Sequence, residues 1–115
     1  MKDRNFEIIC ISGSTRFLSL MYEVAEILSL ENAIVVMPFV NTRDEKFSGL
    51  DINFNMLVGL HAQKIVLCSE LFVVNPDNYI GESTSSEINF AKWSKKKVNY
   101  YHGSYIEKII EERRK

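Results

Sequence analysis

Short apolar runs alternate along the chain with longer stretches in which apolar residues recur every three or four positions. The short runs are rich in β-branched residues and predict buried strands at residues 6–12, 33–38, 71–75 and 97–101. The longer stretches predict amphipathic helices at residues 15–31, 51–70, 83–96 and 104–115. Residues 39–50 are polar and mixed, which predicts a loop.

Strands that alternate with helices in this way predict a parallel sheet. Strands that are apolar on both sides fit a sheet that is covered on both faces. Right-handed crossovers then give an α/β three-layer sandwich, with a flavodoxin-like or Rossmann-like parallel sheet of about four or five strands. The 115 residues suffice for one compact domain, so we expect residues 1–115 to form a single domain.

Several helix positions carry more specific expectations. Asp51 suits the N-cap of the second helix. In the third helix, Ile88, Ala91 and Trp93 are expected to face the core. His61 lies in the second helix among apolar residues, which is typical of a histidine on a helix face or in a core.

Charge and composition exclude several classes of function. The net charge is −1, which argues against a protein that binds nucleic acid polymers, since these need a basic face. No apolar run approaches the roughly 20 residues that span a bilayer, so we expect no membrane association. The amino terminus is charged and lacks an apolar signal stretch, which predicts a cytoplasmic protein.

The two cysteines, Cys10 and Cys68, both lie inside apolar runs. They are therefore expected to be buried and reduced, as in a cytosolic protein. No pair of Cys or His residues has metal-ligand spacing. We expect neither a metal nor another cofactor.

The first candidate site is the loop "SGSTR", which runs from the first strand into the first helix as Ser12, Gly13, Ser14, Thr15 and Arg16. A glycine here lets the backbone turn tightly and approach a ligand, and free N–H groups at a helix start attract anions. The alternative is a tight turn with a capping Ser or Thr. The loop is neither a P-loop nor a GxGxxG fingerprint.

The second candidate site is the loop "GESTSSE", which contains Gly81, Ser83, Thr84, Ser85 and Glu87. Ser83 or Thr84 suits an N-cap, and Thr84 with Glu87 fits a capping box. One cap needs one hydroxyl, however, and the loop has four, which suits a phosphate or the hydroxyls of a sugar. Glu87 would point back toward these groups, where a carboxylate is suited to attack an anomeric carbon.

Two further positions are candidates because of their place in the predicted fold. Asn75 ends the third strand, at the edge of the sheet where such folds bind ligands. Asp44 lies in the longest loop beside Arg43 and Glu45, and these residues either line a base pocket or are solvated.

With both loops described, the chain resembles the nucleoside 2-deoxyribosyltransferase superfamily, which includes the 2'-deoxynucleoside 5'-phosphate N-hydrolases. Residues 13–16 match the Gly-Ser-x-Arg that ends the first strand of those hydrolases. Thr84 and residues 87–91 fit a small-residue loop followed by Glu-x-x-x-Ala on a helix. "YIGESTSSEI" is similar to small bacterial and phage members, and the resemblance covers most of the chain.

Two positions depart from the family pattern. Three residues before the glycine of the first loop, where the family usually carries a tyrosine that assists at the sugar, this chain has Cys10. Ahead of the third strand, where the family carries an aspartate near the sugar hydroxyl, the candidates are Ser69 and Glu70.

The resemblance implies that Glu87 attacks C1' of a 2'-deoxynucleoside or its 5'-monophosphate, from the face opposite the base and through an oxocarbenium-like transition state. The base leaves, protonated by solvent or by a residue such as Asp44, and water or a second base takes the sugar. A 5'-phosphate is expected among Ser83, Thr84, Ser85 and residues 13–16. Because an acid repels a phosphate, Glu82 either turns outward or holds a sugar hydroxyl.

The resemblance also implies a small-molecule nucleoside or nucleotide as ligand. It implies a homodimer or higher homo-oligomer, in which partner residues complete the site. Two other interpretations stay open, a nucleotide-binding or sensing module without turnover and a scaffold whose hydroxyl-rich loop is only a helix cap. Cys10 in place of the tyrosine favours the sensing module, and Glu87 favours the enzyme.

Overall fold

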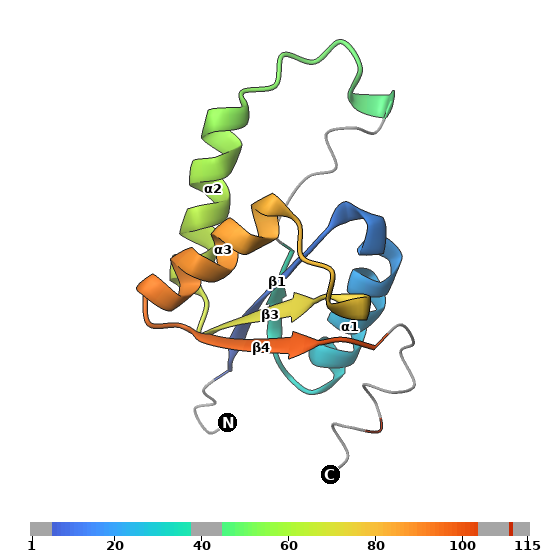
Figure 1. The fold of residues 1–115 in the computed structure, drawn as a ribbon, viewed down its shortest axis with the longest axis vertical. Helices are drawn as coiled ribbons and strands as arrows, with labels where there is room; N and C mark the ends of the chain where they lie inside the picture. Colours follow the sequence, from blue (N-terminus) through green and yellow to red (C-terminus); the bar gives the residue numbers. More distant parts are fainter. Residues whose placement is uncertain (1–5, 38–44, 104–110, 112–115) are drawn as a thin grey trace, which may run out of the picture.

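In the part of the chain that the structure describes, four parallel strands form one sheet in the order β2-β1-β3-β4 (Figure 1). The computed structural model describes residues 6–37, 45–103 and 111. The strands are β1 (Ile8–Gly13), β2 (Ile34–Val36), β3 (Glu70–Val74) and β4 (Lys97–Tyr101). The α-helices are α1 (Leu18–Leu30), α2 (Phe54–Leu67) and α3 (Glu82–Trp93). The described residues also form the 3-10 turns η1 (Thr15–Phe17), η2 (Glu45–Phe47) and η3 (Pro76–Asn78).

The helices cover the two faces of the sheet, with α1 on one face and α2 and α3 on the other (Figure 1). Successive strand residues point to opposite faces, so β1 sends Ile9 and Ile11 toward α1 and Cys10 toward α2 and α3. On β3, Val74 packs on the α1 face and Val73 on the other. The predicted α/β three-layer sandwich with a parallel sheet is therefore confirmed.

The prediction of four buried strands holds for the central strands and not for the edges of the described sheet. β1 and β3 are buried along almost their whole length. β2 is only three residues long and Ile34 is half exposed, because this edge strand has a neighbour on one side only. β4 is likewise partly exposed, with Tyr101 as its buried anchor.

Two predicted helix positions are wrong. α2 begins after Asn53, whose side-chain Oδ1 accepts a hydrogen bond from the N–H of Met56 at 3.0 Å, so Asn53 and not Asp51 is the N-cap. Trp93 is 80% exposed and stacks on Phe90, whereas Ile88 and Ala91 are buried as predicted. The reason is the helical spacing: Trp93 follows Ile88 by five residues, which turns it about 140° away around the helix.

Other expectations fall on positions that the structure does not describe. These are most of the predicted terminal helix at 104–115, the loop residues 39–44 including Asp44, and residues 1–5. Within the described ranges, no helix has both the length and the apolar character needed to cross a bilayer.

Candidate functional site

The two candidate loops lie side by side because they follow neighbouring parallel strands. In the register of β1 and β3, Ser12 lies opposite Val73 and Gly13 lies opposite Val74. A Cβ atom on Gly13 would lie 2.7 Å from the carbonyl oxygen of Val74 and 3.0 Å from the sulfur of Met21. Glycine at position 13 therefore permits the close approach of the two strand ends from which the loops leave.

A hydrogen bond joins the first residue of the first loop to the last residue of the second. The Ser12 hydroxyl donates to Oε1 of Glu87 at 2.7 Å. Ser12 is fully buried and, two residues after Cys10, points to the sheet face that α3 covers. Glu87 lies in the second turn of α3, so the helix holds its carboxylate over the end of β1.

This arrangement contradicts the capping interpretation of the second loop. The N-cap of α3 is Gly81, and no side-chain hydrogen bond caps the helix. Ser83 and Thr84 lie within the helix, which begins one residue earlier than predicted, and the Glu87 carboxylate accepts from Ser12. The predicted Thr84–Glu87 capping box is therefore wrong, and a cap does not account for the hydroxyl-rich sequence.

The electrostatic surroundings of Glu87 combine opposing influences. Burial raises the pKa of the Glu87 carboxyl above the ordinary value for a glutamate, because a buried carboxylate loses its hydration. The hydrogen bond from Ser12 and the positive charge of Lys64 act in the opposite direction. Lys64 is half-buried on α2, and its Nζ donates to the carbonyl oxygen of Met37 at 3.1 Å. The result is a poorly hydrated carboxylate with a donor and a cation nearby.

Two thiols and an imidazole lie in the same layer. Cys10 and Cys68 are both buried and free, as predicted. Burial raises the pKa of both thiols, so neither is a thiolate at neutral pH. Burial and the charge of Lys64 lower the pKa of His61, which is therefore neutral at pH 7. Nε2 of His61 is buried and has no hydrogen-bond partner within the described part of the chain.

The first loop turns its donors outward. Ser14 is the N-cap of η1, and its Oγ accepts from the N–H of Arg16 at 3.3 Å. Thr15 and Arg16 are exposed. The Arg16 guanidinium lies 3.8 Å from the ring centroid of Tyr79, and the Phe17 ring meets the same tyrosine edge-on at 6.0 Å. Through these contacts the first loop packs against Tyr79, which precedes the second loop.

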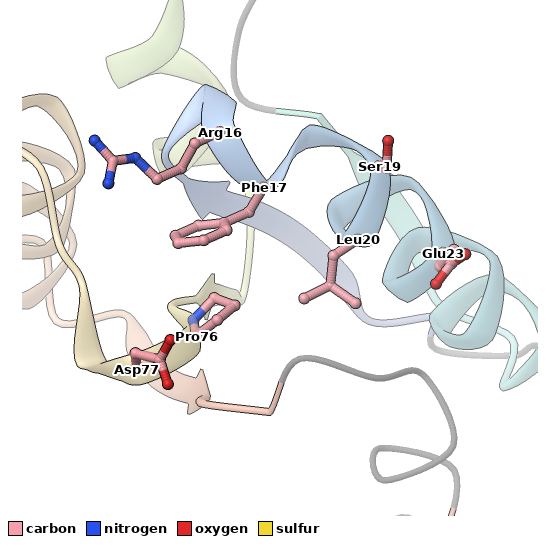
Figure 2. Close-up of a pocket in the computed structure, with 7 residues that line it drawn as sticks. All are labelled: Arg16, Phe17, Ser19, Leu20, Glu23, Pro76 and Asp77. Carbon is pink, nitrogen blue, oxygen red and sulfur yellow. The ribbon is translucent and has the colours of Figure 1, made fainter.

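Beside these rings lies a hollow of about 370 Å³ between the start of α1 and the η3 turn. Figure 2 shows Phe17 and Leu20 on one side of it and Pro76 and Asp77 on the other. Its lining residues are Arg16, Phe17, Ser19, Leu20, Glu23, Pro76 and Asp77. The hollow belongs to the α1 face of the sheet, whereas Ser12 and Glu87 meet on the face covered by α2 and α3. It therefore adjoins the carboxylate site and does not contain it.

The second loop divides its polar groups between solvent and interior. Ser83 and Ser85 are exposed and available to a ligand, whereas Thr84 is buried. Glu82 is also exposed, in the first turn of α3, which fits the first of the two alternatives, that it turns outward.

Asn75 adds a buried acceptor at the end of β3. Its side chain is 2% exposed, and Oδ1 has no hydrogen-bond partner among the residues that the structure describes. It follows Val73 by two residues and so continues the face on which Glu87 lies. A buried acceptor without a donor costs free energy, which a ligand hydroxyl or amino group would recover.

Two predicted helpers lie at the wrong end of the sheet. Glu70 begins β3 opposite Ile9 and accepts a hydrogen bond from Asn99 at 2.8 Å. Ser69 donates to the carbonyl oxygen of Ile8 at 3.1 Å. Both residues therefore lie at the amino ends of the strands, roughly 10 Å along β1 from Ser12. The structure does not bring them to the site, and Asp44 lies outside the described residues.

The sequence interpretation missed residues that the fold brings to the site. Lys64 comes from the middle of α2, and its proximity to Glu87 depends on how α2 and α3 pack, for which the sequence holds no local signal. Tyr79 and Phe17 were detectable as aromatic residues flanking the two loops, but their pairing with Arg16 depends on the approach of those loops.

Comparison with known proteins adds no assignment. No family model matches the chain, and a search of curated proteins finds no match. Among the described residues, no three His, Cys, Asp or Glu side chains gather in a way that could hold a metal ion. The established description is thus an α/β domain with a half-buried Glu87 bound to Ser12 at the carboxyl edge of a parallel sheet.

Proposed function

We propose that the protein cleaves or transfers the N-glycosidic bond of a 2'-deoxynucleoside or its 5'-monophosphate, with Glu87 as the nucleophile. The observation that carries this proposal is the Ser12–Glu87 hydrogen bond, which holds a partly desolvated carboxylate where parallel α/β sheets bind ligands. A carboxylate with little hydration is a better nucleophile than a hydrated one. The resemblance of the two loops to the deoxyribosyltransferase superfamily supports the choice of substrate.

The proposed reaction has two balanced steps. Ser12 holds Oε1 of Glu87, so we assign the attack on C1' to Oε2. The new O–C1' bond forms as the C1'–N bond breaks, and the departing base takes its electron pair from that bond and a proton from solvent. Water then attacks C1', releases the sugar and passes a proton to solvent, or the nitrogen of a second base takes the sugar. Either route restores the Glu87 carboxylate.

The surrounding groups have separate roles in this proposal. The exposed hydroxyls of Ser83 and Ser85 and the guanidinium of Arg16 are donors suited to a 5'-phosphate. Oδ1 of Asn75 accepts a hydrogen bond from a hydroxyl of the sugar. The two reduced, buried thiols fit a protein that works in a reducing compartment such as the cytoplasm.

The test is release of free base from a panel of 2'-deoxynucleosides and their 5'-monophosphates, with and without an acceptor base, followed by chromatography. Wild type is compared with Glu87→Gln, which keeps the size of the side chain, and with Glu26→Gln, which changes an exposed glutamate on α1. We expect base release by wild type and Glu26→Gln and none by Glu87→Gln. Base release by Glu87→Gln at the wild-type rate would exclude Glu87 as the nucleophile.

A second candidate function is nucleotide binding without turnover. It is favoured by Cys10, a buried, protonated thiol at the position where the resembled family carries a tyrosine that assists at the sugar. This alternative predicts that wild type releases no base from any substrate in the panel and that one of the same compounds still raises its thermal unfolding temperature. It also predicts that Glu87→Gln leaves that stabilisation in place.

A further inference from the structure

The interior side of α2 extends to the carboxylate site. The side chains on this side recur every three or four residues and are partly or fully buried, as Leu57, His61, Lys64 and Ile65. Ile65 packs with Cys10 of β1 on the sheet face that α2 and α3 cover, and α2 lies against α3 there (Figure 1). His61 therefore belongs to the layer between the two helices and the sheet.

His61 and Ser12 lie at a similar height along the sheet. Helix α2 leads directly into β3, so the helix runs opposite to the strands (Figure 1). From Ile65 back to His61, α2 covers about 6 Å toward the carboxyl edge of the sheet. From Cys10 forward to Ser12, β1 covers about 7 Å in the same direction. Because Ile65 and Cys10 pack in one cluster, His61 is brought to the level of the Ser12–Glu87 hydrogen bond.

One ammonium group influences both His61 and Glu87. Burial and then the charge of Lys64 lower the pKa of His61, and the same charge opposes the rise that burial causes in the pKa of Glu87. The imidazole is therefore uncharged at neutral pH. No described residue forms a hydrogen bond with its buried Nε2. A molecule bound beside Glu87 would supply the partner that a buried polar atom normally has.

We propose that His61 is a second catalytic residue, which takes a proton from the water that hydrolyses the glycosyl-enzyme. This inference rests on the proposed function and adds the base that its second step lacks. The water oxygen bonds to C1', and the bond between C1' and Oε2 breaks and returns its electron pair to Glu87. One proton of the water passes to Nε2 of His61, and the imidazolium then releases its proton to solvent.

The charges of this layer suit such a proton transfer. His61 becomes positive as Glu87 regains its negative charge, so the net charge of the pair does not change during the step. The new imidazolium then has an anion nearby, which offsets the repulsion from Lys64.

The two groups also come from suitable directions. In a retaining reaction the water attacks from the side that the base has left, so its general base lies across C1' from the nucleophile. Glu87 belongs to α3 and His61 to α2, so the two side chains approach the site from different helices.

The first test compares the first turnover with the steady state, on a 2'-deoxynucleotide that wild type cleaves. His61→Ala should release about one equivalent of base in a burst. It should then turn over at least about 100-fold more slowly than wild type. Intact-protein mass spectrometry should show the glycosyl adduct on a larger fraction of His61→Ala than of wild type. His61→Gln, which fills the space without a basic nitrogen, should behave in the same way, and circular dichroism checks that both variants fold.

The second test supplies a nucleophile that has no proton to lose. Sodium azide should restore the turnover of His61→Ala, with the glycosyl azide as product, and should leave Glu87→Gln inactive. The matched control is His102→Ala, which changes the other histidine of the chain, an exposed residue stacked on Tyr100, and should turn over as wild type does.

The outcomes separate this inference from the proposed function. If His61→Ala turns over at the wild-type rate, Glu87 keeps its role and the inference about His61 is overturned. A slow His61→Ala that accumulates no adduct and gains nothing from azide would show a structural role for His61 and would also overturn it. If wild type releases no base from any substrate of the panel, the proposed function fails, and this inference fails with it.

Discussion

The Ser12 hydroxyl donates a hydrogen bond of 2.7 Å to the Glu87 carboxylate, across 75 positions of the sequence. The bond connects the end of β1 with the second turn of α3, and it opposes the effect of burial on the pKa of Glu87. It is therefore a structural link between two elements and an electrostatic support for the carboxylate. Both roles can be measured.

Removing the hydroxyl should displace the pH dependence of the proposed reaction. In Ser12→Ala the pKa of Glu87 loses a lowering influence, so the carboxylate becomes protonated at a higher pH than in wild type. We expect the acidic limb of kcat/KM to move to higher pH and kcat/KM at neutral pH to fall roughly tenfold. Ser29→Ala, which removes a hydroxyl bonded to Ala25 on α1, is the control and should leave the profile in place.

Ionisation of the same carboxyl group should lower the free energy of unfolding as the pH rises from acidic values. Burial raises the folded-state pKa of Glu87 above its ordinary value of 4.5, so folding favours the protonated carboxyl. The stability that this preference contributes is complete below pH 4.5 and is lost as the pH rises through the folded pKa. Glu87→Gln does not ionise and should unfold a few degrees above wild type at about pH 8, with the difference shrinking toward pH 4. Thermal unfolding across this range checks the trend, and an equal difference at both ends would contradict it.

Replacing Asn75 should raise the stability of the protein and weaken its binding of substrate. Replacing it with leucine removes a buried Oδ1 that no described residue donates to, so Asn75→Leu should raise the free energy of unfolding by about 1 kcal/mol. If Oδ1 accepts a sugar hydroxyl, the same variant should bind the substrate about tenfold more weakly. Asn89→Leu, at an exposed position on α3, is the control for binding. A variant with lower stability and unchanged affinity would argue that Asn75 is structural.

Two glycines should respond to alanine in opposite directions. In Gly13→Ala the new Cβ would meet a backbone oxygen of β3 at 2.7 Å, so the strand ends must separate, at a cost of about 1–3 kcal/mol. In Gly59→Ala the new Cβ meets no atom within 4 Å, and the better helix propensity should stabilise the protein by about 0.5–1 kcal/mol. Chemical denaturation of both variants measures the two values. Equal effects would contradict the close approach at position 13.

The single tryptophan reports on the outer side of α3. Because Trp93 is 80% exposed, its fluorescence should be that of a solvated indole and should be strongly quenched by iodide in the native state. Trp93→Ala should change the free energy of unfolding by no more than about 0.5 kcal/mol. A blue-shifted, poorly quenched emission would mean that another surface covers this residue.

The strand and helix order was predictable because it follows from local patterns. The runs at 71–75 and 97–101 lie within one residue of β3 and β4, since apolar β-branched clusters bounded by turn residues identify strands without tertiary information. The exposure of β2 was not predictable in this way, because which strand lies at an edge depends on the order of strands in the sheet.

The site was predictable in its members and less so in its contacts. Ser12 and Glu87 were both candidates, but a capping box with Thr84 was an open alternative for Glu87, and the bond to Ser12 exists only once α3 lies over β1. Ser69 and Glu70 were misplaced because a position ahead of a strand lies at the opposite edge from the residues that follow a neighbouring parallel strand. Lys64 was missed because its neighbours come from other elements.

The end of β1 separates two surfaces, with Glu87 on the side of α2 and α3 and the hollow beside Phe17 on the side of α1. Gly13 lies between them, and Arg16, which lines the hollow, is the residue that the proposed phosphate site shares with it. Because of this division, one surface can be altered by substitution without altering the other. Residues around the hollow, such as Ser19 and Leu20, can be varied in a library to alter what is recognised there, while the hydrogen bond that orients the carboxylate stays intact on the other side of the strand.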